Sequence, residues 1–254
     1  MESPPPLLLA FETATRAASV ALLRGSELIA EERTPGDRTT AETLLPALDA
    51  LLAGAGLTPA AVDAFAVSIG PGSFTGLRVG IATVKGLAFG TGRPVAPVPT
   101  LAALARTAPE PREAVVAMLD ARRGEVYAAG YGPSDTALLP SEFLPEGVYT
   151  AEALAGRLPR TCLLVGEGVG VCGDWLRARL GEGVQLQPSR HREPRARHVG
   201  ALGAALLAAG GGVDAADVVP NYLRRAEAEV KRTGERFEAP APPSERRGGR
   251  RQGG

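Results

Sequence analysis

The chain has 254 residues, of which 44% are hydrophobic, and this is enough to bury the core of one large domain or two small ones. The formal net charge is zero, but seven basic and three acidic residues follow position 230, so this C-terminal part carries +4 and the remainder −4. The negative charge of the remainder argues against nucleic-acid binding by that part alone, because such affinity comes largely from neutralised phosphates.

The first half of the chain predicts three short strands followed by alternating helices and strands. Apolar runs bounded by turn residues indicate the strands, and a 3.6-residue periodicity indicates the helices. Thr39 and Glu42 have capping-box spacing at the start of the first helix. The predicted strands are 7–12, 18–24, 27–32, 65–69 and 95–98, and the predicted helices are 40–53, 75–90 and 100–107.

The same order of elements recurs after a proline-rich segment at 108–111. Strands are predicted at 114–119, 125–131, 137–144, 162–165 and 184–187, and helices at 151–157, 172–180 and 196–209. Three strands followed by helix, strand, helix, strand and helix therefore occur twice. This order is typical of the RNase H-like half of an actin/hexokinase/Hsp70-type ATPase fold. Two unrelated α/β segments that share an order by chance are the alternative.

We therefore predict an α/β protein with a duplicated RNase H-like fold, in which two lobes each contain a mixed sheet flanked by helices. The N-terminal lobe is predicted at 1–107, completed by the helix at 196–209, and the second lobe at 108–230. Residues 231–254 lack periodicity and are rich in Pro, Gly and Arg, which predicts a disordered basic tail.

The most informative motif is the glycine-rich turn between the strand at 65–69 and the helix at 75–90. It contains no lysine where a P-loop requires one, and Ser73 lacks the flanking glycines of a nucleophile elbow. The simplest interpretation is a turn in which Ser73 or Thr75 caps the helix, and an anion site at the helix N-terminus is the alternative. The motif residues are Gly70, Gly72, Ser73, Phe74 and Thr75.

The predicted helices at 40–53 and 75–90 have few charged residues to place in water. This indicates that one partner surface covers both of them. One carries a leucine stripe, and the other an apolar face beside a groove of small residues. Each glycine inside a helix costs about 1 kcal/mol relative to alanine, so a close approach of another backbone is expected there. We predict a partner interface formed by Leu44, Leu45, Leu48, Leu51, Leu52, Gly76, Leu77, Gly80, Ile81 and Val84. Both helices lying wholly inside the chain is the alternative.

Four other residues are candidates for a remnant nucleotide cleft. Glu12 and Asp120 follow the first strand of each half, and Gly166 and Gly168 form a turn before the helix at 172–180. Glu12 is longer by one methylene than the aspartate that usually holds a nucleotide's metal, and Asp120 has the alternative role of bonding local backbone. His191 and His198 are expected to be surface residues. No catalytic residue and no metal ligand is predicted.

Cellular location is expected to be cytoplasmic. Cys162 and Cys172 form neither a disulfide framework nor a zinc motif, which fits a reducing compartment. The N-terminus lacks the basic start of a signal peptide, and no apolar run reaches the length needed to span a bilayer. We expect a soluble, intracellular protein.

Four stretches of the sequence resemble motifs of the TsaB family, which supplies the dimerisation subunit of the bacterial tRNA threonylcarbamoyladenosine machinery. They occur in the family's order over about residues 7–230. Two positions depart from the family pattern, because residue 12 is Glu where many relatives have Asp, and residue 40 is Thr where members often have His. The four stretches are 11–15 with 19–22, 70–78, 119–127 and 220–225.

The resemblance implies an actin-like fold and a pseudoenzyme subunit that binds and activates a TsaD-like catalytic subunit through a helix–helix interface. The TsaD-like enzyme transfers threonylcarbamoyl from threonylcarbamoyl-AMP to N6 of the adenosine 3′ of the anticodon, in tRNAs that read codons starting with A. A TsaE-like ATPase joins the complex, tRNA is bound only indirectly, and no membrane partner is expected. Alone, the chain is expected to form a homodimer.

This chain alone is expected to hold no cofactor and to bind neither ATP nor ADP tightly. In the complex, ATP or ADP is expected at the interface between the subunits. An active actin-fold ATPase or kinase, in which Glu12 and Asp120 would hold Mg²⁺, is the alternative function. A peptidase is disfavoured because the sequence offers neither a Ser/His pair nor a zinc-ligand helix.

Overall fold

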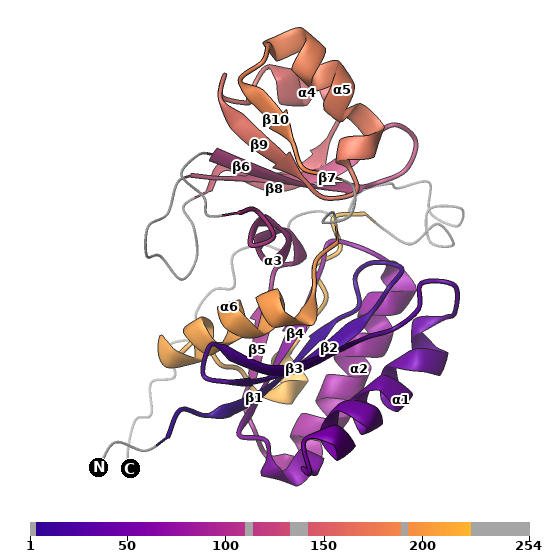
Figure 1. Ribbon diagram of the computed structural model, residues 1–254, viewed down its shortest axis with the longest axis vertical. Coiled ribbons are helices and arrows are strands. Elements are labelled where there is room, and N and C mark those ends of the chain that lie inside the picture. Colours follow the sequence, from indigo (N-terminus) through magenta and orange to yellow (C-terminus); the bar gives the residue numbers. More distant parts are fainter. Residues whose placement is uncertain (1–3, 110–113, 133–141, 189–192, 225–254) are drawn as a thin grey trace, which may run out of the picture. The chain divides into compact units, whose positions relative to one another are not determined.

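A computed structural model of the chain describes residues 4–109, 114–132, 142–188 and 193–224 (Figure 1). The chain divides into a compact unit, Met1–Asn221, and a second unit, Tyr222–Gly254. The predicted tail at 231–254 lies outside the described residues. Within the described ranges, none of the helices is both long and apolar enough to cross a membrane.

Sheet A contains the first five strands in the order β3-β2-β1-β4-β5 (Figure 1). β1 is antiparallel to β2 and parallel to β4, β2 is antiparallel to β3, and β4 is parallel to β5. β1 and β4 are buried along their whole length, which explains why they read as continuous apolar runs. The strands are β1 (Leu7–Glu12), β2 (Ser19–Arg24), β3 (Glu27–Arg33), β4 (Ala64–Ser68) and β5 (Val95–Val98).

Sheet B repeats this topology in the second half, in the order β10-β9-β6-β7-β8. β6 is antiparallel to β7 and parallel to β9, as β1 is to β2 and β4. Both sheets therefore have the strand order of an RNase H-like fold, and the predicted duplication is confirmed. The strands are β6 (Ala114–Asp120), β7 (Val126–Tyr131), β8 (Glu142–Tyr149), β9 (Cys162–Val165) and β10 (Val184–Leu186).

One strand lies later in the sequence than predicted. We expected a strand at 137–144, whereas β8 runs from Glu142 to Tyr149, and residues 137–141 lie outside the described residues. β8 contains Pro145 and Gly147, both of which disfavour a strand assignment from local sequence. Pairing with β7, through a ladder that contains two irregularities, overrides that local preference.

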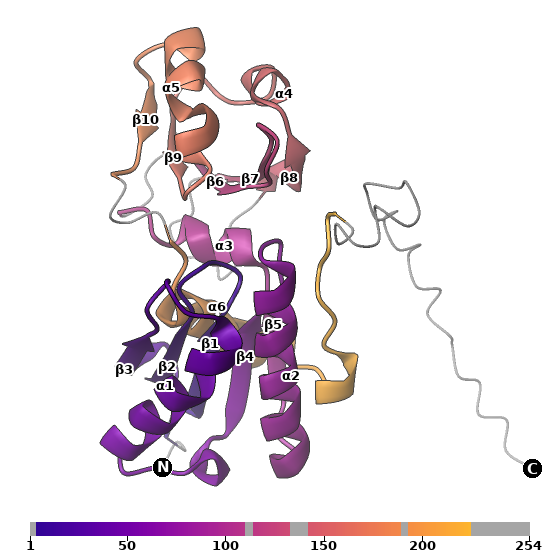
Figure 2. The same ribbon diagram turned by 90° about the vertical axis from the view of Figure 1, so that its right-hand side faces the viewer.

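α1 and α2 lie side by side on one face of sheet A (Figure 2), and α6 covers the other face by packing on β1, β2, β4 and β5. α3 packs on β6 and β7, whereas α5 packs against α4 and the opposite face of sheet B. The packing of α6 on sheet A is thus observed, while the predicted lobe limits stay a prediction. The helices are α1 (Thr40–Gly54), α2 (Phe74–Thr91), α3 (Thr100–Ala105), α4 (Ala151–Ala155), α5 (Val169–Leu180) and α6 (Ala196–Ala208), with short 3₁₀ turns η1 (Pro59–Ala61) and η3 (Ala215–Asp217).

Local capping interactions determine where α1 and α2 begin and where α2 ends. Ser73 Oγ accepts a hydrogen bond from the backbone N–H of Gly76 at 3.2 Å, so Ser73 is the N-cap of α2. Gly92, with φ of 65°, ends α2 in the left-handed conformation that glycine adopts without strain. At the start of α1, the backbone N–H of Thr39 donates to Glu42 Oε2 at 3.0 Å.

Candidate functional site

Gly72 in the motif turn and Gly76 and Gly80 in α2 make room for the chain's own turn after β1. A Cβ atom added at Gly76 would lie 2.1 Å from the backbone oxygen of Thr13, and one at Gly80 would lie 2.2 Å from Thr13 Oγ1. At Gly72, a Cβ atom would lie 2.5 Å from the backbone oxygen of Ala14. The close backbone approach that we expected from a partner is therefore made by residues 13 and 14 of the same chain.

Gly70 faces a C-terminal segment in the same way. Its φ is 117°, and a Cβ atom there would lie 2.5 Å from the backbone oxygen of Asn221. The backbone N–H of Asn221 donates to the carbonyl of Ile69 at 2.7 Å, and the side-chain amide of Asn221 donates to Glu146 Oε1. Asn221 thus contacts the start of the turn at 70–78, although the two are far apart in the sequence.

Glu12 is the last residue of β1, and its side chain is fully buried. One carboxylate oxygen, Oε1, accepts a hydrogen bond from the backbone N–H of Ala14 at 2.6 Å. Burial raises the pKa of Glu12 to about 7, although the bonds from Ala14 and Ser68 oppose the shift. Glu12 Oε2 and Thr13 Oγ1 are buried without a partner in the described part of the chain. A carboxyl group with 0% exposure is a poor fit to a magnesium nucleotide.

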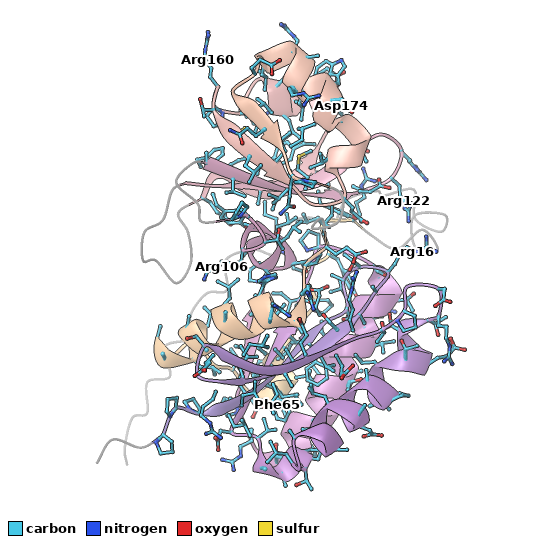
Figure 3. The ribbon with its side chains drawn as sticks, viewed as in Figure 1. Arg16, Phe65, Arg106, Arg122, Arg160 and Asp174 are labelled. Atoms are coloured by element: carbon cyan, nitrogen blue, oxygen red, sulfur yellow. The ribbon has the colours of Figure 1, made fainter. Side chains whose placement is uncertain are left out.

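Asp120 occupies the equivalent position at the end of β6, but its turn is open. Asp120 Oδ1 accepts from the backbone N–H of Arg122 at 2.7 Å, and the Arg122 side chain is 82% exposed (Figure 3). Arg122, Arg123 and Gly124 have φ values of 67°, 59° and 77°. Burial raises the pKa of the nearby Glu167, and the charge of Asp120 adds to the shift. The local role that we left open for Asp120 is observed.

Gly166 and Gly168 pack against the chain's own strand. A Cβ atom at Gly166 would lie 2.2 Å from the backbone oxygen of Met118 and 2.5 Å from Leu104 Cδ2. At Gly168, it would lie 2.8 Å from the carbonyl carbon of Met118. The approach that an adenosine would need at these glycines is occupied by β6 and α3. A nucleotide cleft formed by Glu12, Asp120 and these glycines stays a prediction.

Nine of the ten predicted interface residues are buried within the chain. Six of these nine are aliphatic residues that share a hydrophobic cluster with sheet A, whereas Gly76 and Gly80 face Thr13. Only Leu45 points outward, with 52% of its surface exposed. A strongly exposed residue that the sequence analysis missed is Phe89 on α2, at 88% exposure. Its signal was present, since Ala82, Gly86 and Phe89 share one helix face at spacings of four and three. The buried nine are Leu44, Leu48, Leu51, Leu52, Gly76, Leu77, Gly80, Ile81 and Val84.

No group of three or more His, Cys, Asp or Glu side chains that could hold a metal occurs among the described residues. His191 lies outside the described residues. His198 was expected on the surface, and this is wrong: it is half-buried on α6, and burial lowers its pKa to about 4. The free cysteines Cys162 and Cys172 are both buried in sheet B and α5.

Comparison with known proteins matches this arrangement to one family. A family model described as TsaD: tRNA N6-adenosine threonylcarbamoyltransferase matches residues 34–232. The tRNA threonylcarbamoyladenosine biosynthesis protein TsaB of Bacillus subtilis is 30% identical over 88% of this chain and 96% of its own length. The corresponding protein of Escherichia coli is 34% identical over 85% of this chain and 94% of its own length.

The chain belongs to the TsaB family. A match to the TsaB protein of Haemophilus influenzae is 49% identical but spans only 47% of this chain and 51% of that relative. YeaZ from Pseudomonas aeruginosa has a solved structure that is similar, with 36% sequence identity and a TM-score of 0.73, covering 86% of this chain and all of that one. The predicted family is therefore confirmed, and so is the predicted fold class.

Proposed function

We propose that the chain is a non-catalytic subunit in tRNA threonylcarbamoyladenosine biosynthesis, which binds and activates a TsaD-like enzyme through the outward faces of α1 and α2. The proposal takes its pathway from the names of the relatives and from the family model. Contact with a TsaE-like ATPase, indirect contact with tRNA and self-association in the absence of the partner are part of the same proposal. A cytoplasmic location follows from this role.

The outward faces of α1 and α2 are the observation that carries the proposal. Both charged side chains of α2 are engaged within the chain: Arg78 stacks over the Phe74 ring at 3.8 Å, and Lys85 Nζ donates to the carbonyl of Ala216 at 3.0 Å. An exposed helix face without free charge, which carries a phenylalanine at 88% exposure, has the character of the central part of an interface.

Two glycines on this face support the same conclusion. Gly86 and Gly90 have nothing of the chain within 4 Å of an added Cβ atom, in contrast to Gly76 and Gly80. Each costs about 1 kcal/mol of helix stability relative to alanine without any internal packing benefit. A partner helix that approaches closely at these two positions would offset that cost. The glycine argument thus applies to the outer face of α2, about two to four turns later than the sequence analysis placed it.

The proposal that the subunit is non-catalytic rests on the surroundings of Glu12. In an active actin-fold ATPase or kinase, the carboxylate after β1 must reach a nucleotide's metal, and here it is fully buried with a raised pKa. The glycines that would admit phosphates are packed against the chain's own backbone. We therefore expect the isolated chain to bind neither ATP nor ADP tightly, with any nucleotide held at the interface of the complex.

The test is co-purification of the chain with its TsaD-like partner, followed by a tRNA modification assay with and without the chain. Phe89→Asp and Leu45→Asp are expected to weaken the heterodimer at least about 10-fold each, because a charge would be buried against an apolar partner. Trp175→Asp is the matched control, because Trp175 is an exposed aromatic residue (43%) on α5, away from the proposed face.

Two results would contradict the proposal. Complexes of Phe89→Asp and Leu45→Asp that are as tight as that of the unchanged chain would exclude this face as the interface. Magnesium-dependent ATP binding by the isolated chain at micromolar concentration, lost in Glu12→Ala, would favour the ATPase or kinase alternative. Isothermal titration calorimetry measures both the affinity of the heterodimer and the affinity of the isolated chain for ATP.

A further inference from the structure

A segment near the end of the compact unit runs along α2, on the side of α2 that faces away from α1 (Figure 2). This flanking segment (residues 214–221) contains η3, which packs on α2, and ends at Asn221, beside the glycine-rich turn that precedes α2. α1, α2 and the flanking segment therefore lie next to one another in that order. The proposed interface on α1 and α2 is thus bordered by a third element of the same chain.

The backbone of the flanking segment is held in place on both sides of Val219. The carbonyl of Ala216 accepts a hydrogen bond from Lys85 Nζ at 3.0 Å, which joins the segment to α2. The side chain of Val218 is buried in the hydrophobic cluster that sheet A shares with α1 and α2. The backbone N–H of Asn221 donates to the carbonyl of the residue after β4 at 2.7 Å. Val219 is therefore presented at a fixed place, which lowers the entropic cost of binding there.

Val219 itself lies outside this core, and 66% of its surface is exposed. Among the described residues, only one large apolar side chain is more exposed, Phe89 on α2, and the next after Val219 is Leu45 on α1. A single exposed apolar residue is ordinary on a protein surface. Here the three most exposed ones occur on three adjacent elements, which indicates one continuous binding surface.

The charges of the flanking segment differ from those of α2. Both basic side chains of α2 are engaged within the chain, whereas the only charged residues of the flanking segment are Asp214 and Asp217. Asp214 Oδ1 accepts from the backbone N–H of Ala216 at 2.8 Å, so Asp214 caps η3. Asp217 is exposed, and its side chain makes no hydrogen bond or ion pair within the described ranges. A partner that fits here offers an apolar side chain to Val219 and a basic one to Asp217.

We propose that the TsaD-like partner extends beyond α2 onto the flanking segment, where it buries Val219 and places a basic side chain opposite Asp217. The inference rests on the proposed function and adds a third element to its interface. Continuity is the main argument, because the flanking segment packs directly on α2 and carries the second most exposed large apolar side chain of the described residues. A partner that covered Phe89 and left Val219 in water would leave adjacent apolar surface unburied.

The first test is isothermal titration calorimetry of the full chain with its TsaD-like partner. Val219→Asp is expected to weaken the heterodimer at least about 5-fold, because it buries a carboxylate against apolar side chains. Val171→Asp is the matched control, since Val171 is also an exposed valine but lies on α5, and it is expected to leave the affinity unchanged. Urea unfolding of Val219→Asp is expected to give the midpoint of the unchanged chain, because the side chain lies outside the core.

Asp217→Asn tests the expected charge at the border of the interface. The affinity is expected to fall about 2- to 3-fold at low salt and to equal that of the unchanged chain at high salt, because salt screens a pair between exposed charges. Asp174→Asn removes the same charge from an exposed aspartate on α5 (Figure 3) and is expected to have no effect at either salt concentration. An unchanged affinity of Asp217→Asn at low salt would contradict the basic side chain opposite Asp217.

A labelling experiment locates the contact without introducing a charge. Both natural cysteines, Cys162 and Cys172, are buried, so Val219→Cys introduces an exposed thiol into a chain whose own thiols are shielded. With the TsaD-like partner in excess and no TsaE-like ATPase present, alkylation of this thiol is expected to slow at least about 10-fold, because the centre of an interface excludes water and solutes. Val171→Cys is expected to react at the same rate in the free and the bound chain. Mass spectrometry of the chain measures both rates.

Two results would overturn the inference: a heterodimer of unchanged affinity in Val219→Asp, or a Val219→Cys thiol that reacts equally fast in the free and the bound chain. Protection that rises with the concentration of the isolated chain and is not increased by the partner would assign the flanking segment to contact between two copies, and would also overturn it. The proposed function fails separately, through tight complexes of Phe89→Asp and Leu45→Asp. A heterodimer that depends on Phe89 but leaves Val219→Cys reactive excludes only the flanking segment.

Discussion

The turns after β1 and β6 occupy the same place in the same strand order, yet their carboxylates lie in opposite surroundings. Each carboxylate accepts a hydrogen bond from the backbone N–H two residues later, Glu12 from Ala14 at 2.6 Å and Asp120 from Arg122 at 2.7 Å. Glu12 is 0% exposed, whereas Asp120 is half-buried beside a largely exposed arginine. The local hydrogen bond is therefore the same in both turns, and only the burial of the carboxylate by neighbouring elements differs.

The helix that follows the neighbouring strand decides this difference. α2 lacks Cβ atoms at Gly76 and Gly80, so it lies directly on Thr13 and seals the first turn. The corresponding glycine before α5, Gly168, makes room for Met118 inside β6, upstream of the second turn. The second turn consequently projects beyond its helix. Burial of the carboxylate depends on where the glycines lie in another element and not on the turn sequence.

The largest expected effect comes from filling one of these glycines. Gly76→Ala places a Cβ atom 2.1 Å from the backbone oxygen of Thr13, and we expect a loss of unfolding free energy of more than about 3 kcal/mol. The matched control is Gly86→Ala on the open face of the same helix, where helix propensity predicts a gain of about 1 kcal/mol. Urea unfolding followed by circular dichroism measures both changes. Equal midpoints for the two variants would contradict the packing argument.

A slightly smaller effect is expected from the buried carboxyl group itself. The pKa of Glu12 is about 7 in the folded chain against 4.5 as its ordinary value, so the folded state retains a proton that the unfolded state releases. Stability therefore falls as the pH rises through this window, and it stays low above it. Glu12→Gln mimics the protonated form and is expected to be up to about 3 kcal/mol more stable than the unchanged chain at high pH.

The measurement is urea unfolding of both chains from pH 4 to pH 8. Near pH 4 the two stabilities are expected to coincide, because Glu12 is then protonated in both states. Glu146, whose pKa burial also raises to about 7, contributes the same pH dependence to both chains and cancels in the difference. A stability difference that does not change with pH would show that Glu12 is ionised when buried.

The smallest expected effect concerns the open turn. Arg122 has a φ of 67°, a conformation that costs a residue with a Cβ atom about 1 kcal/mol relative to glycine. Its ion pair with Asp120, at 3.4 Å and largely exposed, contributes little to stability. Arg122→Gly is therefore expected to raise the melting temperature by about 2–4 °C. Arg122→Asn, which tolerates the left-handed region, is expected to give a smaller increase, and no increase in either variant would contradict the assignment of strain to this turn.

Most of the fold could be predicted from the sequence because its signals are local. Continuous apolar runs gave β1 and β4, and capping residues gave the starts of α1 and α2, where Ser73 proved to be the N-cap. β8 was misplaced because Pro145 and Gly147 disfavour a strand, and only pairing with β7 reveals it. The repetition of the element order was sufficient to predict the duplication.

The candidate site was less accessible to sequence reasoning. Helical periodicity identified the apolar side of α1 and α2 correctly, but it cannot distinguish a face that packs on the chain's own sheet from one that packs on a partner. Leu77 and Val84 proved to be core residues, whereas the exposed Phe89 went unnoticed at the end of α2.

The order of strands and helices, the duplication and the family are properties of the sequence alone, because hydrophobic periodicity, turn residues and motif spacing are all read along the chain. Which glycine receives which backbone, which carboxylate is sealed and which charges gather were decided only by the tertiary structure. The physical reason is that burial and electrostatic energy depend on neighbours in space, and Gly80 meets Thr13 as Arg195 meets Glu31, across distances in sequence that no local pattern spans.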